Sequence, residues 1–141
     1  MADNKIKYST ALRRFLFHTN HIIGYDPKIW LFGDGRSGTT WVSNLINHDK
    51  YFREFFEPFH PEFIPQMNFF SSHYYVRPNE VNEKLTNVSN KVFAGKLWNL
   101  RTDQENGIGI YKGLFVKDIF SNLFSNWVYQ NYKDLHFIFL I

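Results

Sequence analysis

The stretch with the clearest chemical content is the octapeptide GDGRSGTT, which begins at Gly33. Its glycines have the spacing of a nucleoside-triphosphate loop, G-x-x-x-x-G-K-[ST], in which backbone N–H groups and a lysine hold phosphate oxygens. Gly38 keeps the second glycine position and Thr40 keeps the hydroxyl, but Thr39 stands where the lysine is required. Arg36 supplies a cation instead. Because the lysine is missing, a magnesium-bound triphosphate is disfavoured and we expect a different anionic ligand.

The residues around the octapeptide predict a strand before it and a helix after it. The apolar run 29–32 is typical of a buried parallel strand. A helix is predicted from Thr39 to about residue 47, with one apolar face formed by Trp41, Val42, Leu45 and Ile46. A strand, a glycine loop and a helix N-terminus together present free N–H groups and a positive helix dipole, so we expect an anion site. The alternative is an ordinary glycine turn between a strand and a helix.

The same residues resemble a known family. RSGTTW, residues 36–41, is similar to the 5′-phosphosulfate loop of sulfotransferases, which use 3′-phosphoadenosine 5′-phosphosulfate (PAPS) as sulfuryl donor. FFEP, residues 55–58, resembles the Glu-Pro signature of carbohydrate and bacterial sulfotransferases. Residues 116–120, with the apolar run 137–141, resemble the approach to the family's second nucleotide motif. The resemblance implies an enzyme that sulfates a hydroxyl group of a carbohydrate or other small molecule, with PAPS as co-substrate.

The resemblance also assigns donor-binding roles to individual residues. The phosphosulfate would be held by the loop and the start of the helix: Gly35, Arg36, Ser37, Gly38, Thr39, Thr40 and Trp41. Arg36 would also meet the negative charge that grows on the leaving phosphate oxygen. Trp41 would pack beside the adenine ring, and a core position on the first helix is an equal alternative.

Sulfuryl transfer needs a base for the acceptor proton, and Glu57 is the candidate. It follows a second apolar stretch at the carboxyl end of a predicted strand, where ligands bind in open α/β sheets. The Phe and Pro side chains around it would raise its pKa toward neutrality. The alternative for Glu57 is a surface glutamate at a strand end.

Two further polar residues are candidates for the same site. His60 is a rival base, since the ordinary pKa of histidine is closer to neutral, and the alternative is a packed structural histidine. Lys117 follows another predicted strand and could bind the substrate or the donor. Its alternative is an exposed lysine on the following helix.

Composition narrows the classes of function. The chain has 141 residues, which is enough for one domain with a core. Its net charge of +3 suits an anionic cofactor, and the absence of a Lys/Arg run argues against nucleic-acid binding. There is no cysteine and the histidines lack ligand spacing, so we expect no metal site. The N-terminal apolar stretch is too short for a signal peptide or membrane span, which predicts a cytoplasmic protein.

The order of the predicted elements is β-α-β, then an irregular and helical middle, then β-α-β. This order predicts a P-loop-like three-layer α/β/α core with a central parallel sheet over residues 29–141, after a helical segment over residues 1–28. Residues 118–132 have helical character, and residues 136–141 are predicted to form a fully buried central strand.

The position of that last strand carries a further expectation. The chain resembles the N-terminal part of a sulfotransferase domain, truncated after a core strand and without the segments that hold the 3′-phosphate. We expect an uncovered sheet of this kind to favour self-association. Two other classes of function stay open: a P-loop nucleotide kinase or hydrolase, which the missing lysine disfavours, and an inactive remnant that only binds or pairs with other chains.

Overall fold

The computed structural model describes Phe15 and residues 24–71, 74–107 and 109–141 of the chain. The helix predicted over residues 1–28 therefore falls almost entirely outside the described residues. The described chain enters the sheet through residues 24–27, which lead directly into the first strand.

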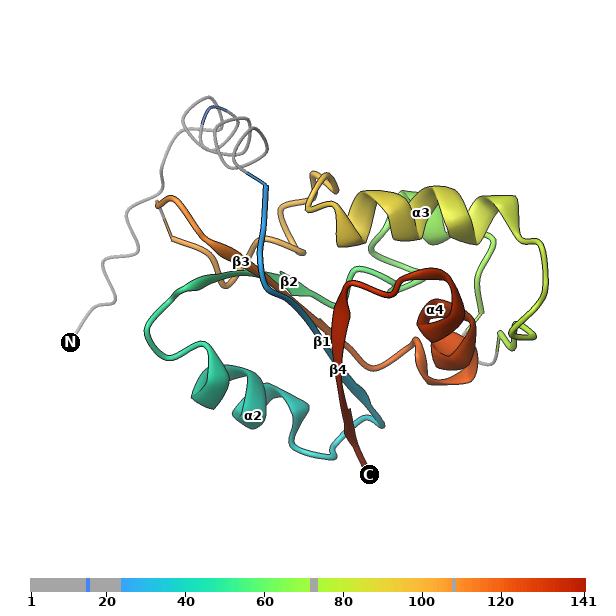
Figure 1. Cartoon of the computed structure of the whole chain (residues 1–141), viewed down its shortest axis with the longest axis horizontal. Helices are drawn as coiled ribbons and strands as arrows, with labels where there is room; N and C mark the ends of the chain where they lie inside the picture. The colour runs from blue at the N-terminus through green and yellow to red at the C-terminus, as the bar shows by residue number, and fades with distance from the viewer. Residues whose placement is uncertain (1–14, 16–23, 72–73, 108) are drawn as a thin grey trace.

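The centre of the molecule is a sheet of four parallel strands (Figure 1). In chain order the strands are β1 (Lys28–Gly33), β2 (Phe52–Phe56), β3 (Gly113–Asp118) and β4 (Leu135–Leu140). Their order across the sheet is β2-β3-β1-β4. The apolar strand β1 pairs with both β3 and β4, so it has the inner position that its sequence predicts. The carboxyl ends of all four strands meet at one edge, where ligands bind in such sheets.

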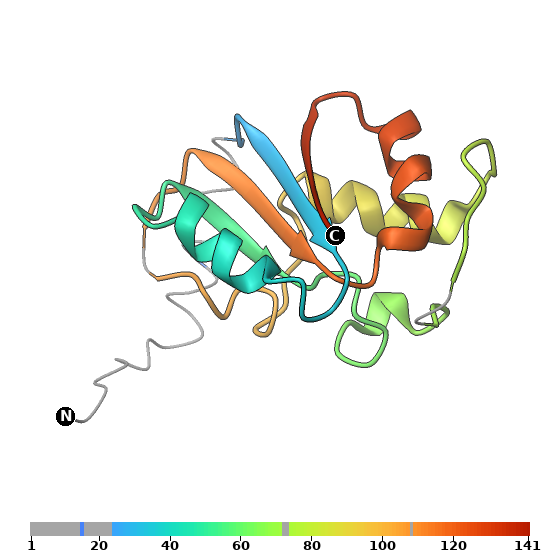
Figure 2. The same cartoon turned by 90° about the horizontal axis from the view of Figure 1, so that it is seen from below.

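Helices cover both faces of the sheet, as Figures 1 and 2 show. The helix α2 (Thr39–Ile46) lies on one face, and α3 (Glu83–Phe93) and α4 (Ser125–Asn131) lie on the other. The short 3-10 turns η1 (Pro65–Met67) and η2 (Asn122–Phe124) complete the described elements. The predicted α/β class, with a parallel sheet in the middle of three layers, is confirmed.

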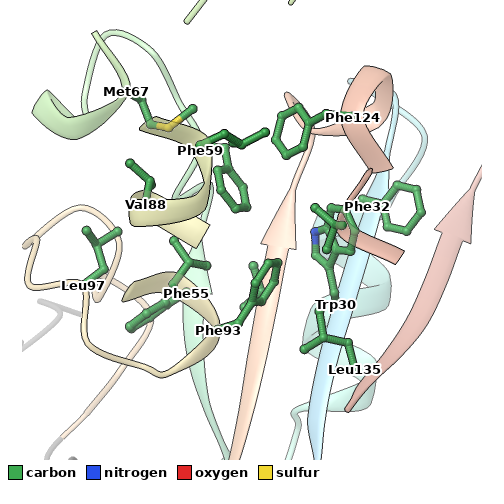
Figure 3. Close-up of a cluster of buried hydrophobic side chains, with 14 of the residues drawn as sticks. Trp30, Phe32, Phe55, Phe59, Met67, Val88, Phe93, Leu97, Phe124 and Leu135 are labelled. Atoms are coloured by element: carbon green, nitrogen blue, oxygen red, sulfur yellow. The ribbon is translucent and has the colours of Figure 1, made fainter. Parts of the chain in front are cut away.

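The main core lies between the sheet and the layer of α3 and α4 (Figure 3). Strand residues on this face point into it, among them Trp30 and Phe32 of β1 and Phe55 of β2. The Trp30 ring is fully buried, and its centroid lies 4.3 Å from that of Phe32 and 5.7 Å from that of Phe93 on α3. This aromatic packing fixes β1, and with it the start of the loop that follows.

The most buried positions of α2 are polar, which corrects part of the sequence prediction, whereas Val42 and Ile46 of the predicted apolar face are half-buried. Trp41 and Leu45 were expected on the apolar face, yet their side chains are 69% and 59% exposed. The buried positions are instead Thr39, Ser43 and Asn47, spaced four residues apart. Ser43 and Asn47 are hydrogen-bonded to β2, so specific polar contacts hold this helix on the sheet. Apolar periodicity was therefore wrong for Trp41 and Leu45, and it did not identify the buried polar positions.

The strand β4 lies at an edge of the sheet, so the prediction of a fully buried central strand is wrong. Among the described strands it pairs only with β1. Leu135 at its start is buried, but the Phe139 side chain is 55% exposed. An uninterrupted apolar run identifies a strand, but it does not fix the place of that strand in the sheet.

The segment after β3 is less helical than predicted. Asp118 completes the strand, and α4 begins only at Ser125, after the turn η2. The Asp118 carboxylate accepts a hydrogen bond of 2.7 Å from the Phe120 N–H, which shapes the exit from the strand. Lys117 and Asp118 therefore belong to a strand end at the carboxyl edge of the sheet.

The opposite edge of the sheet, at β2, is covered by a loop that starts at Arg101. The Phe56 N–H donates to the Thr102 carbonyl at 2.9 Å. The Asn106 side chain accepts from the Glu54 N–H at 2.8 Å and donates to the Glu54 carbonyl at 2.7 Å, as a neighbouring strand would. The loop protects this edge and brings Arg101 to the carboxyl end of β2.

Candidate functional site

The loop between β1 and α2 has the backbone geometry of an anion cradle. Arg36 has a φ of 69° and Gly38 a φ of 87°, so two left-handed residues flank Ser37. The Ser37 N–H and hydroxyl both donate to the Asp34 carbonyl, at 3.2 and 2.7 Å. Left-handed residues of this kind occur in the loops of anion-binding concavities, although the Ser37 N–H itself is already donated within the loop. The helix α2 begins directly after it and adds its first N–H groups.

Glycine is required at positions 33 and 38 of the loop for two different structural reasons. A Cβ atom at Gly33 would lie 2.5 Å from the Leu140 carbonyl oxygen, so this glycine is required by the pairing of β1 with β4. Gly38 has open space around it, and its positive φ is the constraint. Only the second glycine therefore bears on the conformation of the cradle.

A surface depression of about 480 Å³ lies beside the loop and the first turns of α2. Its lining residues are Arg36, Gly38, Thr39, Thr40, Trp41 and Asn44. The Arg36 and Thr40 side chains are exposed there, whereas Thr39 is buried. Trp41 is exposed beside them, so the alternative of a core tryptophan is wrong. Gly35 and Ser37 lie in the same loop and complete the predicted donor-binding segment.

Glu57, the predicted base, lies at the carboxyl end of β2 and is held by two cations. Its side chain is 9% exposed, with Lys117 Nζ 2.8 Å from Oε1 and Arg101 Nη2 2.9 Å from Oε2. The Glu57 backbone has a φ of 48°, and its N–H donates to the Lys117 carbonyl at 2.7 Å. The predicted apolar surroundings are thus only part of its environment, because two cations contact the carboxylate. Glu57 is a buried, doubly paired group, so the alternative of a surface glutamate is wrong.

Lys117 lies on β3, between the strand that carries Glu57 and the strand that carries the glycine loop. Its side chain is 3% exposed, and its ammonium also lies 4.3 Å from the centroid of the Phe56 ring. The alternative of an exposed lysine on a following helix is therefore wrong. Two strand spacings of about 4.8 Å separate β2 from β1, which places Glu57 and the loop roughly 10 Å apart along the edge.

His60 is packed against aromatic rings near Glu57. Its ring centroid lies 4.3 Å from those of both Phe63 and Phe120. Burial, and then the nearby Arg101 guanidinium, lowers the pKa of His60, so the imidazole is neutral near pH 7. Its Nδ1 accepts a hydrogen bond of 3.2 Å from the Glu62 N–H, which puts the remaining proton on Nε2. In this tautomer Nε2 carries a proton and can only donate. The geometry therefore favours a structural role for His60 over that of the rival base.

Asp118 is a buried carboxyl group that the sequence analysis did not indicate as a candidate. It is fully buried at the end of β3, and its two oxygens accept from the N–H groups of Phe59, at 3.0 Å, and Phe120, at 2.7 Å. Burial raises the pKa of Asp118 to about 6, although these two amide hydrogen bonds act in the opposite direction. The residue joins the chain after β2 to the chain after β3, directly beside Lys117.

Arg101 is the second functional candidate that the sequence did not indicate. Its guanidinium carbon lies 4.1 Å from the centroid of the Phe63 ring and 5.5 Å from that of Phe56, and its side chain is 32% exposed. No motif surrounds Arg101, and a polar loop gives no signal of where it folds. Arg101 becomes a candidate through its hydrogen bond to Glu57, a residue 44 positions earlier in the chain.

Among the residues that the structure describes, no three His, Asp or Glu side chains gather in a way that could hold a metal ion. No described helix combines the length and apolar character that a membrane crossing requires. Comparison of the chain with protein-family models, curated proteins and solved structures gave no match. Function is therefore inferred from the residues and geometry of the carboxyl edge.

Proposed function

We propose that this chain takes part in PAPS-dependent sulfuryl transfer to a hydroxyl group of a carbohydrate or other small molecule. The proposal rests chiefly on one observation: a cradle that carries Arg36 and no lysine opens at the same sheet edge as the buried Glu57–Lys117 pair. The resemblance of residues 36–41 and 55–58 to sulfotransferase motifs supports it.

The chemistry of the loop fits the phosphosulfate end of the donor. PAPS, when bound, would supply an activated sulfuryl group on a phosphate leaving group. The cradle N–H groups and the exposed Arg36 and Thr40 side chains would hold the anionic end. The Ser37 hydroxyl proton is already donated to the Asp34 carbonyl, so Ser37 would shape the loop without donating to the ligand.

Glu57 would take the proton of the acceptor hydroxyl as that oxygen bonds to sulfur and the sulfur–phosphate oxygen bond breaks. Both oxygens of Glu57 are held by cations, so one of the two pairs must open before the carboxylate can reach an acceptor hydroxyl. Arg101 is the partner that can leave, because its side chain is 32% exposed whereas that of Lys117 is 3% exposed. Lys117 would then keep Glu57 aimed along the edge and remain available to growing negative charge.

Calorimetric titration with 3′-phosphoadenosine 5′-phosphate (PAP), the product of the donor, tests the proposed donor site. We expect Arg36→Ala to weaken binding roughly 10- to 100-fold, the effect of losing a charged hydrogen-bond partner. Thr40→Ala should weaken it less. Arg77→Ala is the matched control, because Arg77 is an exposed arginine outside the depression, and its binding constant should stay unchanged.

The role of Glu57 is tested separately by following PAP release from PAPS with a panel of hydroxyl acceptors. Glu57→Gln should retain PAP binding and lose at least about 100-fold in the rate of transfer. If the wild-type chain binds no PAP, or if Arg36→Ala binds it as well as the wild type, the proposed donor site is wrong. If Glu57→Gln transfers at the wild-type rate, the proposed base is wrong.

A further inference from the structure

The glycine loop is tied to a distant segment by one side-chain hydrogen bond. Asn122, in the turn η2 between β3 and α4, donates from Nδ2 to Oδ1 of Asp34 at 2.7 Å. The two residues are 88 positions apart in the chain. Gly35, the next loop residue, faces the same segment, since a Cβ atom there would lie 3.9 Å from the Ile119 side chain. The loop therefore rests on the chain that leaves β3.

The hydrogen bond from Asn122 is made to Asp34, the first residue of the strained turn in the loop. Asp34 accepts both hydrogen bonds from Ser37, and these close a four-residue turn. Its third residue, Arg36, has a φ of 69°, a conformation that normally calls for glycine or asparagine. A non-glycine residue held in this region costs free energy, and it persists only where surrounding contacts enforce it. Anchoring Asp34 is one such contact.

The orientation of the Asn122 amide follows from its partner. A carboxylate only accepts hydrogen bonds, so the Asn122 NH₂ group must face Asp34. Its Oδ1 is then turned away, and it is buried without a hydrogen-bond partner among the described residues. A buried acceptor without a partner costs free energy, so the feature that accounts for an amide at this position is its hydrogen bond to Asp34.

We infer that Asn122 is a positioning residue for the anion cradle: by holding Asp34 it keeps the strained turn closed and Arg36 presented to the ligand. The inference rests on the proposed function for the identity of the ligand, but not for the conformation of the loop. It also joins the donor site to the exit of β3, the strand on which Lys117 and Asp118 lie.

Hydrogen exchange of the Ser37 amide, without ligand, tests the conformational part. Asn122→Asp sets a carboxylate against Asp34, so this amide should exchange about tenfold faster than in the wild type, while amides in α3 exchange at unchanged rates. The double variant Asp34→Asn/Asn122→Asp exchanges donor and acceptor, and it should restore the wild-type rate. Asn126→Asp is the matched control, because Asn126 is exposed on α4 and its change should have no effect.

Titration of the same variants with PAP tests the functional part. Asn122→Asp should weaken binding about tenfold, and the double variant should recover it. Asn122→Ala removes the bond without adding charge. If Asn122→Asp unfolds, Asn122→Ala is measured in its place and should show the same direction of change in Ser37 exchange and in PAP binding. Unchanged Ser37 exchange in the single variants, or a double variant as fast as Asn122→Asp, would overturn the inference. If the wild type binds no PAP while the exchange results hold, the proposed function fails and the positioning role stands.

Discussion

Arg36 combines a strained backbone with the exposed cation of the candidate donor site. Its φ of 69° is one that glycine adopts without a steric penalty. Glycine at this position would relieve the strain, and it would also remove the cation that we propose for donor binding. The sequence motif predicted the charge of Arg36, but the strain is visible only in the folded loop.

Arg36→Gly should therefore raise stability and weaken binding together. We expect a gain of about 1 kcal/mol in the free energy of unfolding, or roughly 2–4 °C in melting temperature for a chain of this size. PAP binding should weaken at least as much as in Arg36→Ala. Thermal unfolding and calorimetry measure the two effects, and a variant that is less stable than the wild type would contradict the strain argument.

Asp118 gives the fold a pH dependence with a defined sign. Burial raises its pKa in the folded chain from 3.8 to about 6. The folded state therefore binds this proton more tightly than the unfolded state, and the stability it contributes is present below pH 3.8 and is lost as the pH rises through about 6. At about 1.4 kcal/mol per pH unit, the loss is on the order of 3 kcal/mol.

Urea unfolding of the wild type and of Asp118→Asn between pH 3.5 and about 7 would isolate this term. The asparagine side chain does not titrate. A pH-independent cost of replacing the carboxylate therefore does not alter how the difference in stability between the two proteins changes with pH. We expect the stability of the wild type relative to Asp118→Asn to fall as the pH rises from about 4 to about 6. A difference that stays constant with pH would show that Asp118 does not titrate in this range.

At the scale of elements, α2 is held on the sheet by a polar contact. The Asn47 amide donates to the Phe52 carbonyl and accepts from the Phe52 N–H, both at 3.0 Å, where β2 begins. Ser43 donates to the buried Glu54 on the same strand. These contacts hold the C-terminal half of α2 against β2. They therefore fix the orientation of the helix whose N-terminus follows the glycine loop.

Asn47→Ala should cost about 2 kcal/mol in the free energy of unfolding, because it leaves two backbone groups of Phe52 without their partner. Asn44→Ala is the control, since Asn44 is exposed on the same helix and should change stability by less than about 0.5 kcal/mol. Chemical denaturation of the two variants makes the comparison. Equal stabilities would mean that apolar contacts, and not the Asn47 amide, hold α2.

The positions of the strands along the chain, and their parallel type, were predictable because short apolar runs and the glycines that interrupt them are local signals. The face of α2 was not, because Ser43 and Asn47 are buried through partners on β2 that the helix sequence does not reveal. In the site, the loop residues and Glu57 could be selected from the sequence. Arg101, Asp118 and Asn122 could not, since each acts through a contact with a residue far away in the chain.

At the scale of the whole molecule, the described sheet has one protected edge and one open edge. The loop from Arg101 covers β2, whereas β4 is the outer strand on the other side and its Phe139 side chain is 55% exposed. An open edge with an exposed aromatic side chain favours pairing between chains. The self-association expected from the sequence therefore remains a prediction, now located at β4.

We expect the 141-residue chain to increase in mean mass with concentration in light scattering. Phe139→Lys should suppress the increase, because a charged residue on an edge strand opposes pairing. Val81→Lys is the control, since Val81 is 90% exposed and lies outside β4. A wild-type chain that stays monomeric at high concentration would contradict this prediction.

We propose that the loop of residues 33–40 receives a phosphosulfate donor and not a magnesium-bound triphosphate. Calorimetric titration of the wild-type chain with PAP and with ATP, each with and without Mg²⁺, tests it most directly. We expect PAP to bind equally well in the absence of the metal and Mg²⁺ to give ATP no advantage, because Thr39 stands in the place of the lysine. ATP binding that depends on Mg²⁺, with no binding of PAP, would contradict it.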